Sequence, residues 1–145
     1  MKYTLGLISA NYNKKELEAL TKSRTVATIP FGGRYRLIDF PLSNMVNSGI
    51  FSVGLITPHL YRSILDHIGS GKEFGLSRKN GGLFILPGST YGFDLGKGKF
   101  SLKDLRGNMQ FFKREVYDRV VLSACNKIYN IDYKEIDDFH MKKDV

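Results

Sequence analysis

The chain has no tryptophan and only one cysteine, and no apolar run in it approaches the length of a membrane span. A single cysteine, Cys125, excludes an internal disulfide and is compatible with a reducing compartment. Because roughly 20 consecutive apolar residues are needed to cross a bilayer, and because the N-terminus lacks the pattern of a secretory signal, we expect a cytoplasmic protein without membrane contact. Cys125 itself is expected to be a small buried residue at a strand end.

Glycine is missing from the segment that follows the first predicted strand. Residues 3–9 read as a strand, and Ala10, Asn11, Tyr12 and Asn13 follow it without a glycine. Loops that hold a triphosphate use glycines, because backbone N–H groups then approach the phosphates with no Cβ in the way. Phosphate binding by a loop of that kind is therefore not expected here.

The 145 residues fit one domain, and 42% hydrophobic residues are enough for a packed core. Short apolar runs predict strands buried on both faces over residues 3–9, 52–57 and 120–122. Residues 83–86 are predicted to form an isolated strand within long loops. Helical patterns lie over residues 14–20, 41–47, 60–68, 103–117 and 133–141.

This alternation of strands and helices predicts an α/β fold. We expect an open, doubly wound, mainly parallel, Rossmann-like sheet whose ligand crevice lies at the carboxyl ends of the strands. Gly49 is placed to end one helix in the left-handed conformation, and Gly69 to end the next.

Residues 24–50 read RTVATIPFGGRYRLIDFPLSNMVNSGI. This segment, and above all residues 35–44, resembles the N-terminal signature of the ADP-glucose pyrophosphorylases, the glucose-1-phosphate adenylyltransferases that make the glucose donor for glycogen and starch. The resemblance returns at residues 84–87 and 120–140. It implies that residues 1–145 form the N-terminal part of a nucleotidyltransferase domain, and that the rest of that domain and a C-terminal β-helix are absent from this chain.

The chain departs from that family at several positions. The glycine-rich phosphate loop is missing, and Val26, Ala27 and Thr28 stand where the family has a Lys-Pro-Ala block whose lysine meets the phosphates. Of the family's Gly-Thr-Ala-Asp block, only Gly107 is kept. Asn126 stands where the family has the aspartate that binds the catalytic Mg²⁺, and a neutral amide is a much weaker ligand for this ion than a carboxylate.

These departures predict a loss of catalysis. Removing one preorganised electrostatic group typically costs about 10²- to 10³-fold in rate, and phosphoryl transfer depends on positioning and charge neutralisation. We therefore expect no catalytic residue, metal or cofactor in this chain, which resembles the regulatory subunit that some bacteria carry beside an active, Mg²⁺-dependent subunit. The expected assembly is a hetero-oligomer of the two, and an active adenylyltransferase with an atypical phosphate loop is the alternative.

Four cations flank the segment Phe31-Gly32-Gly33. They are Lys22, Arg24, Arg34 and Arg36, and the two glycines would let backbone N–H groups join them around an anion. In the family, phosphorylated metabolites act as effectors in this neighbourhood, so these residues are candidates for effector or phosphate binding. The simpler alternative is that the arginines pair with Asp39 or neighbouring acids and fix the turn.

Asp39 is a candidate for orienting Arg36 or a substrate group, although a structural ion pair is the simpler interpretation. The histidines, His59, His67 and His140, lie far apart and have no arrangement typical of a zinc site. No metal site is predicted, and His67 is expected to be solvated or to cap a helix.

The net charge of +8 raises a third alternative, a basic nucleic-acid-binding module. Its candidate footprint interleaves cations with Phe100, Phe111 and Phe112; the cations are Lys97, Lys99, Lys103, Arg106, Lys113, Arg114 and Arg119. Acidic residues interrupt this run and no nucleic-acid-binding motif is present. A solvated helix face is therefore the simpler interpretation, and no nucleic-acid partner is expected.

Overall fold

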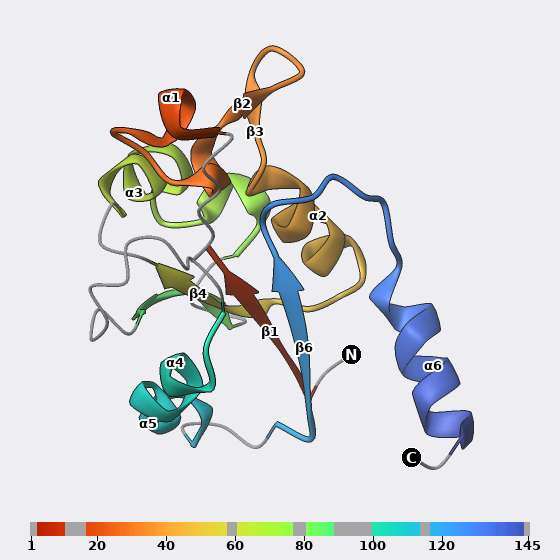
Figure 1. Ribbon diagram of the computed structural model, residues 1–145. Helices are drawn as coiled ribbons and strands as arrows, with labels where there is room; N and C mark the ends of the chain where they lie inside the picture. Colours follow the sequence, from red (N-terminus) through yellow and green to blue (C-terminus); the bar gives the residue numbers. More distant parts are fainter. Residues whose placement is uncertain are drawn as a thin grey trace.

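A parallel sheet forms the centre of the molecule (Figure 1). The computed structural model describes residues 3–10, 17–57, 61–76, 81–88, 100–113 and 117–143. The strands of this sheet are β1 (Thr4–Ser9), β4 (Ser52–Thr57), β5 (Gly82–Pro87) and β6 (Arg119–Ala124), in the order β5-β4-β1-β6. Neighbouring strands are parallel throughout. The predicted α/β class and mainly parallel sheet are confirmed.

Strand β5 corrects one prediction, because it is not isolated. It pairs with β4 in register from Ser52 opposite Gly82 to Thr57 opposite Pro87. It is an edge strand of the described sheet, and its residue Ile85 is exposed although residues 83–86 are all apolar. The apolar run predicts a strand, but it does not show which strand it pairs with.

The helices and a small hairpin fill the connections between these strands. The hairpin consists of β2 (Pro30–Phe31) and β3 (Tyr35–Arg36). The helices are α1 (Glu18–Thr21), η2 (Val26–Thr28), α2 (Asp39–Asn47), α3 (Arg62–Ile68), η3 (Lys72–Phe74), α4 (Leu102–Gly107), α5 (Met109–Phe112) and α6 (Tyr133–Lys143). Gly49 and Gly69 follow α2 and α3 with φ of 79° and 50°. Residues 11–16 lie outside the described part, and with them the first three residues of the helix predicted over residues 14–20; the rest of that prediction overlaps α1.

The single helix predicted over residues 103–117 is wrong, because α4 and α5 are separated at Asn108. The backbone there leaves the helical region, with φ −111° and ψ 18°. The Asn108 side-chain amide donates to the Asp104 carbonyl at 2.8 Å and to the Pro87 carbonyl at 2.9 Å. A buried asparagine that bonds to backbone groups competes with the helix ladder, and here it ties the break to the end of β5.

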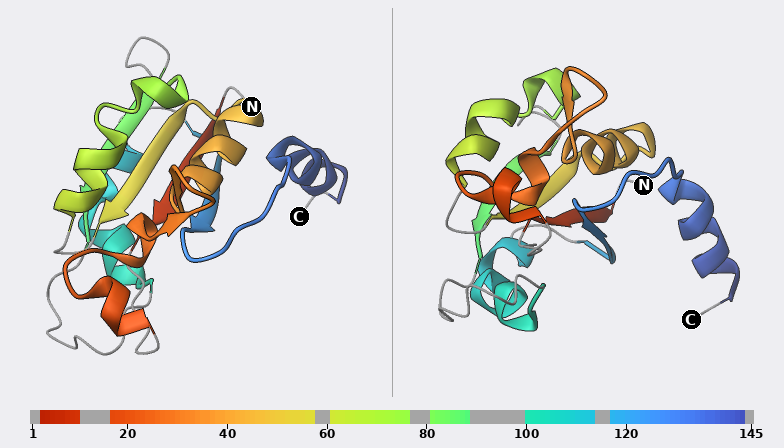
Figure 2. Two further views of the ribbon diagram at one scale, coloured as in Figure 1. Left: turned by 90° about the horizontal axis from the view of Figure 1, so that it is seen from above. Right: turned by 45° about the horizontal axis from the view of Figure 1, so that its top comes forward.

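Helices cover both faces of the sheet, and each face has its own core (Figure 2). Helices α2 and α3 pack over one face, where Ile8, Leu42 and Ile64 belong to one apolar cluster. Helices α4 and α5 cover the other, where Leu7 and Phe111 belong to a second cluster. Neighbouring residues of β1 therefore point to opposite sides, as the two-residue repeat of a strand requires.

Two strand glycines let the helices approach closely. A Cβ on Gly6 would lie 2.5 Å from the Met45 Sδ atom of α2, and one on Gly54 would lie 2.9 Å from Phe111 Cε1 of α5. Both distances are shorter than any ordinary contact. Each face of the sheet thus has one position where only glycine leaves room for the covering helix.

The strand order creates a topological switch point. From β1 the chain moves to β4 and β5 on one side, and it then returns as β6 on the other side of β1. In open α/β sheets, ligands bind outside the carboxyl ends of the strands at such a point. The expected crevice therefore lies next to Ala10 and Asn126.

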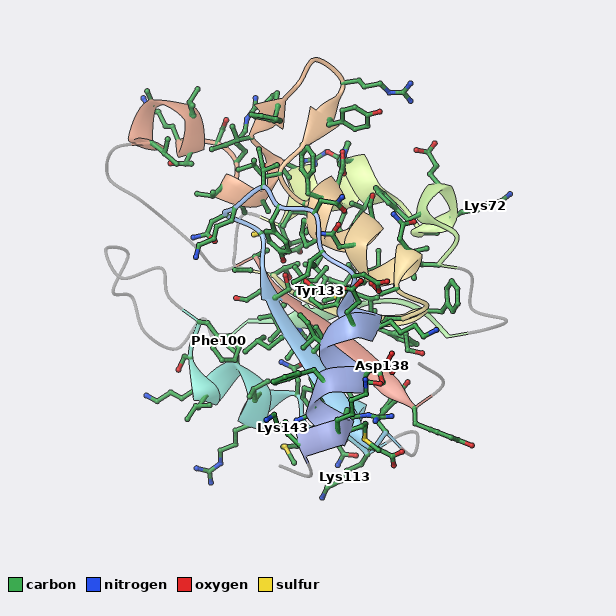
Figure 3. The ribbon with its side chains drawn as sticks, turned by 90° about the vertical axis from the view of Figure 1, so that its right-hand side faces the viewer. Lys72, Phe100, Lys113, Tyr133, Asp138 and Lys143 are labelled. Carbon is green, nitrogen blue, oxygen red and sulfur yellow. The ribbon has the colours of Figure 1, made fainter. Side chains whose placement is uncertain are left out.

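Helix α6 stands apart from the sheet (Figures 1 and 2). Tyr133, at its first position, is its one buried residue, and Phe139 is 62% exposed. In Figure 3, Tyr133 lies at the upper end of α6 and Lys143 near its lower end. In the described ranges, no helix has the length and apolar character that crossing a membrane requires.

Candidate functional site

The end of β6 carries the position that bears most directly on catalysis. Asn126 lies two residues beyond the end of this strand, whose last residue, Ala124, pairs with Ser9 of β1. Its side-chain oxygen, Oδ1, is buried and has no hydrogen-bond partner in the described part of the chain. The residues predicted to replace the phosphate loop, Asn11, Tyr12 and Asn13, lie outside the described ranges. At the switch point, the described chain beyond β6 therefore carries Asn126, whose side-chain amide is neutral.

The described residues at this edge do not fit a Mg²⁺ site. This ion is held by carboxylates, usually together with substrate phosphates, and Asn126 offers one uncharged oxygen. Among the described residues, no group of three His, Cys, Asp or Glu side chains is arranged to hold a metal ion. Val26 and Thr28, at the positions of the family's phosphate-binding block, are buried, so that block presents no charge either.

Cys125, beside Asn126, is a buried and unreactive thiol. It is 0% exposed, and burial raises its pKa from 9.0 to about 12, against a smaller opposing effect of a backbone hydrogen bond. Because the thiolate is the nucleophilic form, this cysteine is not a nucleophile near neutral pH. Its predicted role as a small buried residue at a strand end agrees with this position.

The predicted cation cluster lies around the β2–β3 hairpin, at the end of the molecule toward which β1 and β6 point (Figure 1). Gly32 and Gly33 form its tip with φ of 61° and 87°. The guanidinium of Arg34, an exposed residue, lies 5.9 Å from the Tyr35 ring. Lys22 is exposed and Arg24 half-buried in the segment between α1 and η2.

Arg36 differs from the other cations because its guanidinium already has a partner. Its Nη1 donates to the Ser63 carbonyl of α3 at 3.0 Å, and its backbone N–H donates to Asp39 Oδ2 at 2.9 Å. The proposed pairing of its side chain with Asp39 is therefore wrong. Arg36 fastens the hairpin to α3.

Asp39 instead pairs with His67, which the sequence placed in solvent or at a helix cap. His67 Nε2 lies 2.6 Å from Asp39 Oδ1, with the two side chains 19% and 10% exposed. This pair joins the first turn of α2 to the last turn of α3. The two residues are 28 positions apart, and no local sequence pattern links them.

A groove that sequence reasoning missed runs along one side of α2. It consists of two adjoining cavities of about 340 and 290 Å³ that share Asn47 and Asn130. The first is lined by Tyr35, Asp39, Phe40, Ser43, Asn44, Asn47, Tyr129 and Asn130. The second is lined by Asn47, Ser48, Asn130, Ile131, Asp132 and Glu135. The signal in the sequence was the polar face of α2, where Ser43, Asn44 and Asn47 are spaced as neighbours on one side of a helix.

Side-chain hydrogen bonds fix the far wall of this groove to α2. Asn44 Nδ2 donates to the Tyr129 carbonyl at 2.9 Å, and the Tyr133 backbone N–H donates to Ser48 Oγ at 2.8 Å. The Tyr129 hydroxyl bonds to Tyr133 at 3.0 Å and also to Ser123. Burial chiefly raises the pKa of Tyr133 to about 12, so the Tyr133 hydroxyl keeps its proton at neutral pH.

The aromatic residues of the candidate nucleic-acid footprint pack into the core of the molecule. Phe111 is buried and its ring lies 5.0 Å from that of Phe84, while Phe100 and Phe112 pack against the same cluster. Arg119 pairs with Asp137 of α6 at 3.2 Å. The exposed cations that remain within the described ranges are Lys103, Arg106 and Lys113. Lys97, Lys99 and Arg114 lie outside those ranges.

Residues 14–145 match the protein family described as Nucleotidyl transferase. The chain is 38% identical over 138 residues to the glycogen biosynthesis protein GlgD of Geobacillus stearothermophilus, which covers 95% of this chain and 40% of that protein. It is 38% identical over 146 residues to the glucose-1-phosphate adenylyltransferase of Pseudothermotoga lettingae, covering 99% of this chain and 34% of that protein. The chain thus spans between about a third and two fifths of the length of these relatives.

A solved structure supports the fold. The crystal structure described as a glucose-1-phosphate thymidylyltransferase from Bacillus anthracis superposes with a TM-score of 0.75, covering 96% of this chain and 50% of that one. The sequence identity is 20%. At that identity the likeness establishes the architecture of the sheet and its helices.

Proposed function

The chain belongs to the nucleotidyl transferase family, on the branch of the ADP-glucose pyrophosphorylases, and we propose that its full-length protein is a noncatalytic regulatory subunit in glycogen biosynthesis. On this proposal it binds an active glucose-1-phosphate adenylyltransferase subunit in the cytoplasm. It modulates the synthesis of ADP-glucose from ATP and glucose 1-phosphate, and the Mg²⁺ of that reaction belongs to the active partner.

Overall similarity does not separate the relatives named GlgD from those named glucose-1-phosphate adenylyltransferase. A second GlgD protein, from Bacillus subtilis, is 39% identical over 133 residues, covering 91% of this chain and 38% of that protein, and the Pseudothermotoga adenylyltransferase is 38% identical. Both kinds of relative support a place in glycogen synthesis. The choice between them rests on individual residues.

The observation that carries the noncatalytic proposal is the neutral side chain of Asn126 at the switch point. Mg²⁺-dependent phosphoryl transfer needs negatively charged side chains that bind the metal ion and positively charged groups that contact the phosphates. Asn126 supplies no negative charge. The sequence after β1 contains no glycine, so it lacks the usual means of directing backbone N–H groups at a phosphate. Val26 is buried and carries no positive charge.

A regulatory subunit also needs a way to receive a signal, and the hairpin cations provide it on this proposal. Lys22, Arg24 and Arg34 offer charge to a phosphorylated metabolite, while Arg36 holds the hairpin in place through Ser63. Binding there biases one state of the active partner, so the effect is a coupling free energy between two binding events. Arg24→Ala with Arg34→Ala is expected to remove the response to a phosphorylated effector in the mixed assembly.

The test measures ADP-glucose synthesis by the full-length protein alone and mixed with the active subunit from the same source. No activity alone, with altered rate or effector response in the mixture, is the expected result. Robust synthesis by the protein alone would contradict the proposal and support the active enzyme with an atypical phosphate loop.

A variant sharpens this test. Asn126→Asp restores the family's carboxylate but not the phosphate loop, so we expect less than about a tenfold gain in activity, since parts that act as a unit are not additive. Asn130→Asp, four residues along and exposed, is the matched control. A gain of 10²-fold or more, the scale of one electrostatic group, in the Asn126 variant alone would show an otherwise intact active site.

A further inference from the structure

The groove along α2 has the lining of a sugar-binding site, and we propose that it binds the neutral hexose units of an oligosaccharide. The groove adjoins the hairpin, because Tyr35 of β3 lines it and the Arg34 guanidinium lies 5.9 Å from the Tyr35 ring. None of the four candidate cations, and not Asn126, is among the residues that line it. The inference therefore does not depend on whether the protein catalyses nucleotidyl transfer or regulates a partner that does.

The charge of the lining selects against anions. None of the residues that line the two cavities is a lysine or an arginine, whereas Asp39, Asp132 and Glu135 are acidic. Phosphate groups are bound by Arg, Lys or several backbone N–H groups. A nucleotide or sugar phosphate would meet negative charge here, but an uncharged polyol would not.

The uncharged polar groups match sugar hydroxyls. Each side-chain amide both donates and accepts hydrogen bonds, as each hydroxyl of a hexose does. Asn47 and Asn130 are exposed and line both cavities, so they stand at the middle of the groove. Ser43 adds a hydroxyl on the same side of α2.

Aromatic rings occupy one end of the groove. Tyr35 is 50% exposed, and its ring centroid lies 6.3 Å from that of Phe40. Both line the larger cavity together with Tyr129. Binding pockets for small molecules combine such apolar rings with a few placed polar groups, and the C–H faces of a pyranose ring suit an aromatic surface.

The groove is built in advance of binding. The Asn44 and Ser48 hydrogen bonds hold residues 129–133 at a fixed place beside α2. Asp39 to Ser48 spans nine residue steps, which is about 13 Å of helix at 1.5 Å per residue. That length admits more than one sugar ring, so the site fits an oligosaccharide better than a single hexose.

Isothermal titration of the full-length protein with maltotriose tests the inference. We expect saturable binding that the double variant Asn47→Ala, Asn130→Ala weakens about tenfold, the scale of losing two hydrogen bonds. Both side chains are exposed, so the variant is expected to fold. Gln110→Ala, which removes an exposed amide from α5 on the opposite face of the sheet, should bind as the wild type does.

Three results would overturn the inference. They are the absence of saturable maltotriose binding, an unchanged affinity in the double variant, and a tighter binding of glucose 1-phosphate or ATP that depends on Asn47 and Asn130. The last result would assign the groove to an anion despite its acidic lining. None of these measurements involves ADP-glucose synthesis, so their failure is distinct from a failure of the proposed function.

Discussion

Helices α2 and α6 have similar lengths, 9 and 11 residues, but very different surroundings. In α2, Leu42 and Met45 are 0% exposed, whereas in α6, Ile136 and Phe139 are 48% and 62% exposed. Helix α2 packs against β1, where Met45 lies over Gly6, and α6 follows the edge strand β6 (Figure 1). Apolar residues at helical spacing thus predict a helix, but the position of the helix relative to the sheet decides what is buried.

The largest expected difference comes from truncating one apolar side chain in each helix. Leu42→Ala should lower the free energy of unfolding by about 2–5 kcal/mol, because it leaves a cavity in the core. Phe139→Ala should change it by less than about 0.5 kcal/mol, as exposed substitutions do. Denaturant unfolding of the full-length protein measures both. An equal loss in the two variants would break the comparison and show that α6 is covered in the full-length protein.

The next effect concerns the bond that joins α2 to the segment leading into α6. Asn44→Ala leaves the Tyr129 carbonyl without its side-chain donor. The expected loss is about 1–3 kcal/mol, the usual penalty for an unsatisfied buried polar group. Asn47→Ala, one turn away and exposed, is the control, with an expected change within about 0.5 kcal/mol. If the two variants lose the same amount, the bond to Tyr129 does not hold the segment.

A smaller effect is expected where α6 touches β6. Arg119 Nε and Asp137 Oδ1 lie 3.2 Å apart, and their side chains are 25% and 15% exposed. Partly exposed pairs of this kind contribute about 0–1 kcal/mol. A double-mutant cycle with Arg119→Ala and Asp137→Ala measures the coupling directly. A coupling above about 2 kcal/mol would mean that this ion pair, more than Tyr133, fixes α6.

The sequence predicted the strands β1, β4 and β6 and the helices α2 and α6. The predicted burial of β6 on both faces is wrong, because β6 is an edge strand of the described sheet and Val120 and Leu122 are each 49% exposed. The sequence predicted β5 as a strand but missed its pairing with β4, since the apolar run of residues 83–86 does not name a partner strand. It also joined α4 to α5, since the break at Asn108 depends on a bond to Pro87, a contact across 21 residues. Local sequence patterns therefore predict helices and strands, but a hydrogen bond between residues far apart in the sequence can decide where a helix ends.

The candidate sites divide in the same way. Asn126 and the hairpin cations were found because a family pattern marks their positions. The Asp39–His67 pair and the groove beside α2 were not, because each brings together residues that are far apart in sequence. Asn44 and Tyr129 are 85 positions apart, and neither residue alone predicts a groove.

The smallest expected effect on stability at neutral pH comes from the ionisation of Cys125 and Tyr133, two buried residues in the core that α2 covers. Burial raises the pKa of Cys125 from 9.0 and that of Tyr133 from 10.0, each to about 12. The folded state therefore keeps protons that the unfolded chain loses, so stability is fully present below about pH 9 and falls as the pH rises toward 12. Unfolding measured from pH 7 to 10.5 should show this decline, and Cys125→Ala should flatten its first part.

Iodoacetamide should modify Cys125 much more slowly in the native protein than in urea at pH 9, because the thiolate is the reactive form. Equal rates in the two states would mean that this part of the α2 core opens to solvent as freely as the exposed face of α6.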